Sequence, residues 1–440
     1  MNTRASMSRW NHAARVLACL VTFGMTMHHA CGADYFVSPK GDDASPGGRD
    51  QPWKSIGKAA ASMKPGDTAH VLPGTYVEKV AITRSGDEKA GAITYQAEGA
   101  VIVSGKGVTG QDIFHLKDVS HVTLAGFEIR DNLKAADGSG IRIEGAGSHI
   151  SIKNCRIHEI RGKDAMGITV YGSNAETPIS NLLIEDCEIF DCDPAQSEAL
   201  TLNGNVSGFR ILNNIVRDVN NIGICMIGGE AWINKDRTKV TRNGLCKGNK
   251  VSRIRANYGD GYAAGIYVDG GSDIIVEDNE VTGCNLGIEV GAENKGTVTR
   301  RVTVKNNRIW KNQKAGIVLG GYEKNAGRVE ECLFEGNVCY HNDTHEDRNG
   351  ELWIQWSGSN VIKGNIFWAG EEAMLLQSVA GAKGNTLDDN TWYTEAGEDE
   401  ANFTWAGEEI TGFTAYRRFS KQDEKSRFAR PEIALPASTP

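Results

Sequence analysis

The apolar residues of this chain recur in a six-residue phrase whose second and fourth positions are aliphatic or Met. The phrase occurs as GIRIEG from Gly140, GITVYG from Gly167, ALTLNG from Ala199, GICMIG from Gly223, GIYVDG from Gly265, GIEVGA from Gly287, GIVLGG from Gly316, ELWIQW from Glu351 and AMLLQS from Ala373. Alternation with a period of two is typical of a β-strand with one buried face. Each phrase therefore predicts a strand whose second and fourth side chains enter a core, while the third and fifth point outward.

A second phrase alternates with the first and has a polar or Cys residue at its turn. These turn positions are Cys155, Cys187, Asn214, Asn249, Asn279, Asn307, Asn337, Asn365 and Asn390. Asn side chains in stacked coils can bond to one another in a ladder, which satisfies polar groups at a buried bend. The two phrases together predict an all-β fold, a right-handed parallel β-helix with coils of about 20 to 30 residues. A β-propeller or a β-sandwich lacks this register.

A solenoid of this kind needs caps, because its ends would otherwise expose the core. The stretch WKSIGKAAASM, residues 53–63, has the pattern of a short amphipathic helix, and the repeat is lost after Trp392. We therefore predict an N-terminal cap and first coils over 34–110, β-helix repeats over 111–391, and a C-terminal cap and tail over 392–440.

The first 33 residues have the pattern of a signal peptide. Arg4, Arg9 and Arg15 precede the apolar run VLACLVTFGM, and small residues follow. A lipoprotein signal ending at Cys31 is the alternative. No later run is long and apolar enough to span a bilayer. We expect a secreted or periplasmic protein whose mature chain is not inserted in a membrane.

The composition is that of a globular protein with many tight turns, since the 440 residues include 52 Gly, 10 Pro and 24% charged residues. The net charge of -8 comes without a basic block, which argues against nucleic acid as a partner. A chain with its own core does not need disulfides, so we expect Cys155 and Cys187 to be buried, stacked thiols. We expect a monomer.

The segment from Asp34, DYFVSPKGDDASPGGRDQPWKSIGKAAASMKPGDTAHVLPGTY, resembles the N-terminal module of many secreted parallel β-helix proteins that act on polysaccharides. With the coils, this resemblance implies the pectin-lyase-like fold and a polysaccharide or oligosaccharide substrate. The fold carries lyases, hydrolases, epimerases and adhesins, so the chemistry has to come from the outward side chains.

Two outward carboxylates stand on consecutive coils, Asp269 in GIYVDG and Glu289 in GIEVGA. Their positions are offset diagonally, which predicts Cβ atoms about 7–8 Å apart. Glycosidases use two carboxyl groups. The two groups are about 5–5.5 Å apart in enzymes that retain the anomeric configuration and about 6.5–9.5 Å apart in enzymes that invert it. The register permits either outcome, and we expect both acids to face one cavity.

Other residues are predicted to surround this pair. Gly291 and Gly320 would clear space on the next coils. Flat surfaces for a sugar ring would come from Tyr267, Trp353, Tyr322 and Trp232. Polar contacts at the rim would come from Glu230, Glu293, Glu351 and Gln355. Long insertions, which often carry function, fall on the same rim at 228–248, 256–264, 291–300 and 340–350.

This arrangement resembles the β-xylosidase family built on a parallel β-helix, glycoside hydrolase family 120. The resemblance implies that Asp269 in IYVDG is the nucleophile and that Glu289 in IEVGAE is the general acid/base. The chain departs from that family at Gly270, where the family has an aromatic residue. It also lacks a match to the family's sugar-binding side chains and to its β-sandwich domain.

Two other functions fit the sequence. A polysaccharide lyase acting on uronates would use Ca²⁺ on acids such as Asp260, Asp343, Glu346 and Asp347, and a basic residue such as Lys235, Arg237 or Lys295. The pattern of the β-helix pectate lyases, an Asp cluster beside a Lys, is not intact. A non-catalytic glycan-binding protein would need neither Asp269 nor Glu289. For the hydrolase we expect no metal or other cofactor, and we interpret His341 and His345 as surface residues.

Overall fold

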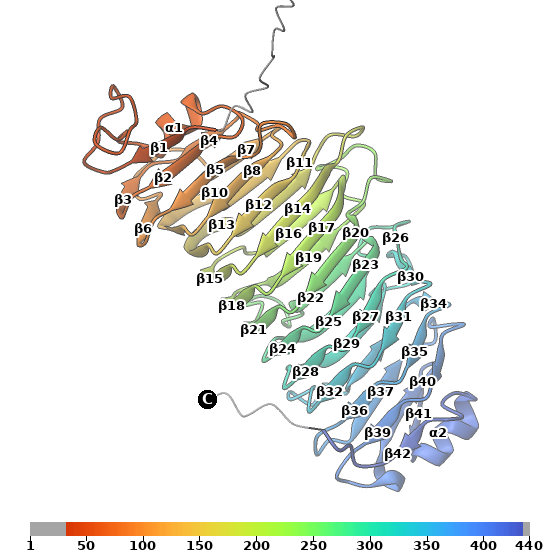
Figure 1. Cartoon of the computed structure of the whole chain (residues 1–440). Coiled ribbons are helices and arrows are strands. Elements are labelled where there is room, and N and C mark those ends of the chain that lie inside the picture. Colours follow the sequence, from red (N-terminus) through yellow and green to blue (C-terminus); the bar gives the residue numbers. More distant parts are fainter. Residues whose placement is uncertain (1–31, 434–440) are drawn as a thin grey trace, which may run out of the picture. The chain divides into compact units, whose positions relative to one another are not determined.

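The computed structural model describes residues 32–433, which form a solenoid of stacked parallel strands (Figure 1). The fold is therefore the predicted parallel β-helix. The expected signal peptide, residues 1–33, lies outside the described residues except for its last two positions. None of the helices in the described part of the chain is long and apolar enough to cross a membrane.

One face of the solenoid is a 17-stranded parallel sheet. Its strands are β1 (Asp34–Val37), β2 (Thr68–Val71), β5 (Ile93–Ala97), β8 (Val122–Ala125), β11 (Gly147–Ser148), β12 (Ile150–Lys153), β14 (Ile179–Glu185), β17 (Val206–Leu212), β20 (Arg242–Lys247), β23 (Ser272–Glu277), β26 (Val298–Arg300), β27 (Thr303–Lys305), β30 (Arg328–Glu330), β31 (Leu333–Glu335), β34 (Ser357–Gly358), β35 (Val361–Lys363) and β38 (Thr386–Asp388).

The remaining strands form a 25-stranded sheet with two branches. Two long strands, β10 (Asn132–Glu144) and β13 (Arg156–Gly172), join the branches. The first branch also contains β3 (Gly74–Val77), β6 (Val101–Ser104), β9 (Glu128–Arg130), β15 (Glu188–Cys192), β18 (Ile215–Val219), β21 (Lys250–Ile254), β24 (Glu280–Thr282), β28 (Arg308–Trp310), β32 (Val338–Tyr340), β36 (Ile366–Trp368), β39 (Thr391–Tyr393) and β42 (Arg427–Phe428).

The second branch carries the six-residue phrases. Its other strands are β4 (Val80–Ile82), β7 (Phe114–Lys117), β16 (Glu198–Gly204), β19 (Ile222–Ile227), β22 (Ala264–Asp269), β25 (Leu286–Gly291), β29 (Ala315–Gly320), β33 (Leu352–Ile354), β37 (Met374–Ser378), β40 (Asn402–Trp405) and β41 (Glu408–Thr411). The predicted alternation holds here, since Ile266, Val268, Ile288 and Val290 are fully buried.

Short helices stand near both ends of the described chain. The helix predicted at 53–63 is present as α1 (Ile56–Ser62), and the hydroxyl of its N-cap residue Ser55 accepts a hydrogen bond from the backbone N–H of Lys58. Near the C-terminus a 3₁₀ turn (Glu398–Glu400) precedes α2 (Phe413–Ser420). The α2 residue Tyr416 stacks on Phe403 of β40 at 4.3 Å between ring centroids, which covers the last coils.

The predicted asparagine ladder is confirmed. The backbone N–H and the side-chain amide of Asn214 both donate to Asn249 Oδ1, at 2.9 and 3.0 Å. The same pair of bonds repeats from Asn249 through Asn279, Asn307, Asn337 and Asn365. Because each amide serves its neighbour, the buried corner has these polar groups satisfied in the coils from Asn214 to Asn390.

The eight cysteines within residues 32–433 are all buried and free. Cys187 stands at the head of the ladder, where its backbone N–H donates to Asn214 Oδ1 at 2.9 Å. The prediction of buried thiols instead of a disulfide framework is therefore confirmed for these residues.

Candidate active site

The third residues of the phrases from Gly140 to Glu351 form one straight row on the outside of the second branch, and Gln377 and Thr404 continue it; we name this the outer row. In the last phrase, AMLLQS, the register differs from the prediction, because the third residue, Leu375, is buried in the core and the fifth, Gln377, pairs with Trp353. Each member pairs in register with the next along consecutive strands. Its members are Arg142, Thr169, Thr201, Cys225, Tyr267, Glu289, Val318, Trp353, Gln377 and Thr404. Because neighbouring strands lie about 4.8 Å apart, this row is the natural axis for an extended ligand.

A cavity of about 540 Å³ lies at the middle of the outer row, over Cys225 and Tyr267, and we name it the acidic cavity. Five carboxylate side chains line it, those of Glu198, Glu230, Asp260, Asp269 and Glu293. The lining also includes the aromatic residues Tyr171, Trp232, Tyr258, Tyr262 and Tyr267. No lysine or arginine of the described chain is part of this lining. A cation lies close to the wall, where Lys314 Nζ stands 4.5 Å from the centre of the Tyr262 ring.

A second cavity of about 460 Å³ follows along the row, and we name it the aromatic cavity. Its apolar surface comes from Tyr262, Tyr267, Leu286, Ala292, Val318, Tyr322 and Trp353. Glu289, Glu293 and Gln355 supply the polar groups, and again no basic residue in the described part of the chain takes part. Tyr267 and Glu293 line both cavities and stand at their junction.

Tyr267 separates the two carboxylates predicted to be catalytic. In the β22–β25 register Tyr267 pairs with Glu289 and Asp269 pairs with Gly291. The Tyr267 hydroxyl lies 2.7 Å from the point where a Cβ of Gly291 would stand. The ring therefore crosses the diagonal between Asp269 and Glu289, and the two acids line different cavities. The expectation that they face one shared cavity is wrong.

Of the two glycines predicted to clear space, Gly320 lines the aromatic cavity, whereas Gly291 does not clear space for a ligand. The Tyr267 ring fills the space over Gly291. At Gly320 the backbone has a φ of +124°, and a Cβ would stand 2.6 Å from the carbonyl carbon of Gln355. Glycine at 320 is therefore required for a positive φ and a close backbone approach, besides its place in the cavity lining.

Burial raises the pKa of Asp269 and of Glu289 well above the usual range, and the negative charge of Glu293 adds to both effects. Burial also raises the pKa of Glu293, with a contribution from Glu230, while a hydrogen bond from Tyr267 opposes the rise. Asp269 Oδ1 accepts the backbone N–H of Glu293 at 2.8 Å. These like charges in a confined space are the type of arrangement found at functional sites.

Glu198 belongs to the same group of acids, although the sequence analysis did not predict it as a site residue. Burial raises its pKa to about 8, with further contributions from Glu293 and Glu230. It stands one residue before the phrase ALTLNG, at the position that pairs with Ile222 on the next strand. The sequence did contain a signal for Glu198. The residue before the next phrase, at the paired position, is the apolar Ile222, so a carboxylate here departs from that pattern.

Several buried polar atoms that face the cavities have no hydrogen-bond partner among the described residues. Asn203 Oδ1 belongs to the acidic cavity, while Trp353 Nε1 and Gln355 Oε1 belong to the aromatic cavity. Asn203 is 3% exposed and Gln355 is 7% exposed. Because buried polar groups are normally paired, these atoms are the ones to which the hydroxyl groups of a ligand can bond.

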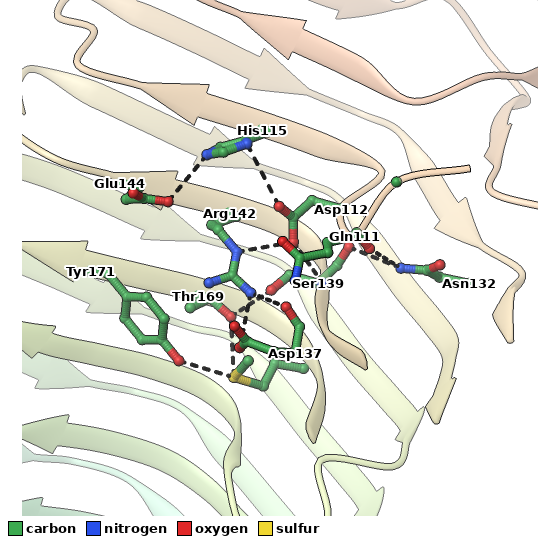
Figure 2. A network of polar contacts seen from close by, with 12 residues as sticks. Gln111, Asp112, His115, Asn132, Asp137, Ser139, Arg142, Glu144, Thr169 and Tyr171 are labelled. Carbon is green, nitrogen blue, oxygen red and sulfur yellow. Dashed lines mark hydrogen bonds and ion pairs between the residues drawn. The ribbon is translucent and has the colours of Figure 1, made fainter. Parts of the chain in front are cut away.

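The N-terminal side of the acidic cavity is braced by the network in Figure 2. Trp232 meets Tyr171 edge to face at 5.5 Å between ring centroids, and the Arg142 guanidinium lies 5.1 Å from the centre of the Tyr171 ring. Arg142 Nε donates to Asp112 Oδ1 at 3.0 Å, and its Nη2 donates to the backbone carbonyl of Asp137. The pairing of this buried cation with Asp112 and Asp137 fixes the aromatic wall.

Glu351 does not lie at the rim, which corrects the prediction for that residue. It is fully buried, and its two carboxylate oxygens accept the backbone N–H of Asn342 at 2.8 Å and the side-chain amide of Asn342 at 2.6 Å. Glu351 occupies the first position of its phrase, which is Gly or Ala in the other copies because it faces the buried corner. There it ends a second ladder that runs from Asn312 through Asn342.

The remaining rim residues do reach the cavities. Trp232 and Tyr322 are 66% and 62% exposed, and Glu230 accepts the side-chain amide of Asn294 at 2.7 Å. By contrast, the acids of loop 340–350 hold that loop together: Asp343 accepts three backbone N–H groups and Asp347 pairs with Lys314 at 2.7 Å. Among residues 32–433 no group of three or more His, Cys, Asp or Glu is arranged to hold a metal ion.

The comparisons with known proteins agree with this architecture. The chain belongs to the Pel9A-like right-handed β-helix family, whose model matches residues 35–360. The uncharacterized protein YwoF of Bacillus subtilis (strain 168) is 33% identical over 423 residues, which cover 92% of this chain and 90% of that protein.

Two solved structures share the fold at low sequence identity. The GH136 lacto-N-biosidase from Eubacterium ramulus matches 82% of this chain and 68% of its own, with a TM-score of 0.63 and 16% identity. The complex of XylC with xylose matches 92% of this chain and 88% of its own, with a TM-score of 0.51 and 12% identity. At such identities the likeness concerns the fold alone.

Proposed function

We propose that this protein is a carbohydrate-active enzyme that hydrolyses a glycosidic bond in a neutral polysaccharide or oligosaccharide. The observation that carries the proposal is the cluster of Asp269, Glu289 and Glu293 around Tyr267, where an acidic and an aromatic cavity meet without a basic residue in either lining. Structural relatives described as a lacto-N-biosidase and as a xylose complex support a sugar substrate.

Asp269 is proposed as the nucleophile. Its Oδ1 accepts the backbone N–H of Glu293, which opposes the rise in the Asp269 pKa caused by burial and by the charge of Glu293. Asp269 has to be deprotonated before it attacks. Asp269 would attack the anomeric carbon as the bond from that carbon to the leaving oxygen breaks.

Glu289 is proposed as the general acid/base. Burial raises its pKa, so it would carry a proton at neutral pH and donate it to the leaving oxygen. In the second step it would take a proton from water, whose oxygen then replaces Asp269 at the anomeric carbon. The sugar has to lie across the edge of the Tyr267 ring, or the ring has to turn aside, because that ring stands between the two acids.

Lysis of a uronate is less well supported than hydrolysis. A lyase needs a basic side chain and a cation for the substrate carboxylate. Two basic residues near the cavities already have partners: Lys314 pairs with Asp347 and lies against the Tyr262 ring, and Arg237 donates to the backbone carbonyl of Gly229 at 2.8 Å. A negative uronate would also meet the acidic cavity's own carboxylates. We propose that the reaction requires no metal, so a chelator should leave the rate unchanged.

Activity screening separates these functions. The purified protein is incubated with aryl glycosides, neutral oligosaccharides and uronate polysaccharides, while reducing ends and the ultraviolet absorbance of unsaturated uronates are followed. We expect reducing ends from a neutral substrate without that absorbance. The absorbance alone would establish a lyase, and glycan binding without any product would establish a non-catalytic binding protein.

Three single variants then assign the roles. Asp269→Asn should abolish turnover, and azide should restore it with a glycosyl azide as product. Glu289→Gln should lose activity on oligosaccharides but keep it on aryl glycosides with good leaving groups, because these need no protonation. If Glu293→Gln, and not Glu289→Gln, keeps activity only on aryl glycosides with good leaving groups, then Glu293 is the acid/base. Unchanged turnover in Asp269→Asn and Glu289→Gln would overturn the assignment of this pair.

We also propose that the protein acts outside the cytoplasm, because residues 1–33 have the pattern of a signal peptide, and that it is a monomer. Cell fractionation with sequencing of the mature N-terminus tests the first statement. Light scattering of the purified protein tests the second.

A further inference from the structure

The outer row continues beyond the aromatic cavity to a third hollow, which we name the distal pocket. It has a volume of about 310 Å³ and is lined by Arg348, Gln377, Ser378, Val379, Ala380, Thr404, Gly407 and Glu409. Gln377 of β37 and Thr404 of β40 pair in register and form its floor. No residue of this pocket takes part in the proposed reaction.

One polar atom of the distal pocket, Gln377 Oε1, is buried and has no hydrogen-bond partner within residues 32–433. Gln377 pairs with Trp353 in the outer row, so its side chain points outward, whereas the next residue, Ser378, pairs with the core residue Ile354 and points into the solenoid. Leaving a buried polar atom unpaired has a cost in stability. The amide oxygen of Gln377 therefore indicates a place where a ligand hydroxyl group can bond.

The walls of the distal pocket carry one charge of each sign. Arg348 Nη2 and Glu409 Oε2 lie 3.5 Å apart, and their side chains are 56% and 75% exposed. An ion pair this exposed contributes little to stability, so its groups are free to exchange partners with a ligand. Because the charges cancel, and because an anion would meet Glu409 and a cation Arg348, the pocket fits a neutral molecule with many hydroxyl groups.

The outer row connects this pocket to the proposed reaction centre. From Glu289 the row runs through Val318 and Trp353 to Gln377, three strand spacings or about 14 Å. Trp353, which is partly exposed and packs on the buried Val318, offers a flat apolar surface on which a sugar ring can stack. On the other side of the acidic cavity the row leads to Arg142, which is buried in its ion pairs.

We propose that the distal pocket is a subsite for the same glycan chain, and that it binds a neutral sugar unit a few units away from the bond that is cleaved. This inference rests on the proposed function. Glu289 faces the aromatic cavity and would protonate the leaving oxygen, so the part of the glycan over Trp353 and Gln377 is the leaving group. Longer substrates therefore gain binding energy on the leaving-group side.

The test measures binding apart from catalysis. Calorimetric titrations use the Asp269→Asn protein with xylo-oligosaccharides and cello-oligosaccharides of two to six units as probes. The affinity for at least one series should rise with chain length. Adding Gln377→Ala should lower the affinity for the longest probe about tenfold and leave that for the shortest probe unchanged. Gln51→Ala, at an exposed glutamine of the N-terminal region, is the matched control and should change neither.

The outcomes separate the subsite from the proposed function. An affinity independent of chain length, an equal loss for short and long probes in Gln377→Ala, or no binding of any probe at millimolar concentration would overturn the subsite. Length-dependent binding that Gln377→Ala abolishes would support the subsite even if the wild-type protein cleaves none of the probes. The absence of cleavage would then count only against the proposed hydrolysis of these glycans.

Discussion

Two stretches of the outer row bury charged side chains in opposite ways. Around Arg142 every charge has a partner, since the guanidinium meets Asp112 and Asp137 (Figure 2). Around Tyr267 carboxylates face one another without a cation, and each raises the pKa of the next. Paired charges fix a structure, whereas unpaired like charges cost stability and are retained where a reaction uses them.

The largest expected effect concerns Asp269. Asp269→Asn should lower kcat/KM about 10⁴-fold or more, because the nucleophile is lost. Its melting temperature at pH 8 should be unchanged or higher by about 2 °C, because the substitution removes one of the mutually repelling charges. Rate assays and thermal unfolding check both halves. A large fall in melting temperature would mean that Asp269 has a structural role like that of Arg142.

Arg142 should show the opposite behaviour. Arg142→Met leaves Asp112 buried without its partner, since the two side chains are 5% and 4% exposed, and should lower the free energy of unfolding by about 3–5 kcal/mol. The matched control is Arg301→Met, because Arg301 pairs with Asp273 at the surface and should cost less than about 1 kcal/mol. Chemical denaturation measures both values. Equal losses in the two variants would contradict the contrast.

A smaller effect is expected in the pH dependence of stability at Glu198. Its pKa is raised from 4.5 to about 8 in the folded protein, so the folded state holds a proton that the unfolded chain has released. This contribution is fully present below pH 4.5, and it is lost as the pH rises towards 8. Glu198→Gln should gain about 3 °C in melting temperature over wild type between pH 5 and pH 8. A constant difference across this range would contradict a raised pKa.

The smallest effect is expected at Glu351. Because this side chain bonds to Asn342 inside the solenoid and touches neither cavity, Glu351→Gln should leave kcat/KM within about twofold of wild type. Glu289→Gln serves as the comparison, since its carboxylate lines the aromatic cavity. A loss on glycan substrates that matches Glu289→Gln would show that Glu351 takes part in binding after all.

The sequence alone determined the fold and the register of the outer row. The period of two in phrases such as GIYVDG indicates which side chains are buried, and the recurring turn Asn from Asn214 to Asn390 indicates how these coils stack, because both signals repeat along the chain and depend on local geometry. The phrase from Ala373 is the exception, since its third residue, Leu375, is buried. The same repetition placed Asp269 and Glu289 on consecutive strands at diagonal positions, and the β22–β25 register agrees.

The tertiary structure decided what surrounds those two acids. The tilt of the Tyr267 ring over Gly291, the approach of Glu198 and Glu293, and the inward turn of Glu351 occur once each and come from loops or corners. Such features depend on packing between residues far apart in the chain, so the repeat pattern cannot predict them. The repeat therefore determines the strand position of each residue, and the neighbouring coils and loops determine where its functional group lies.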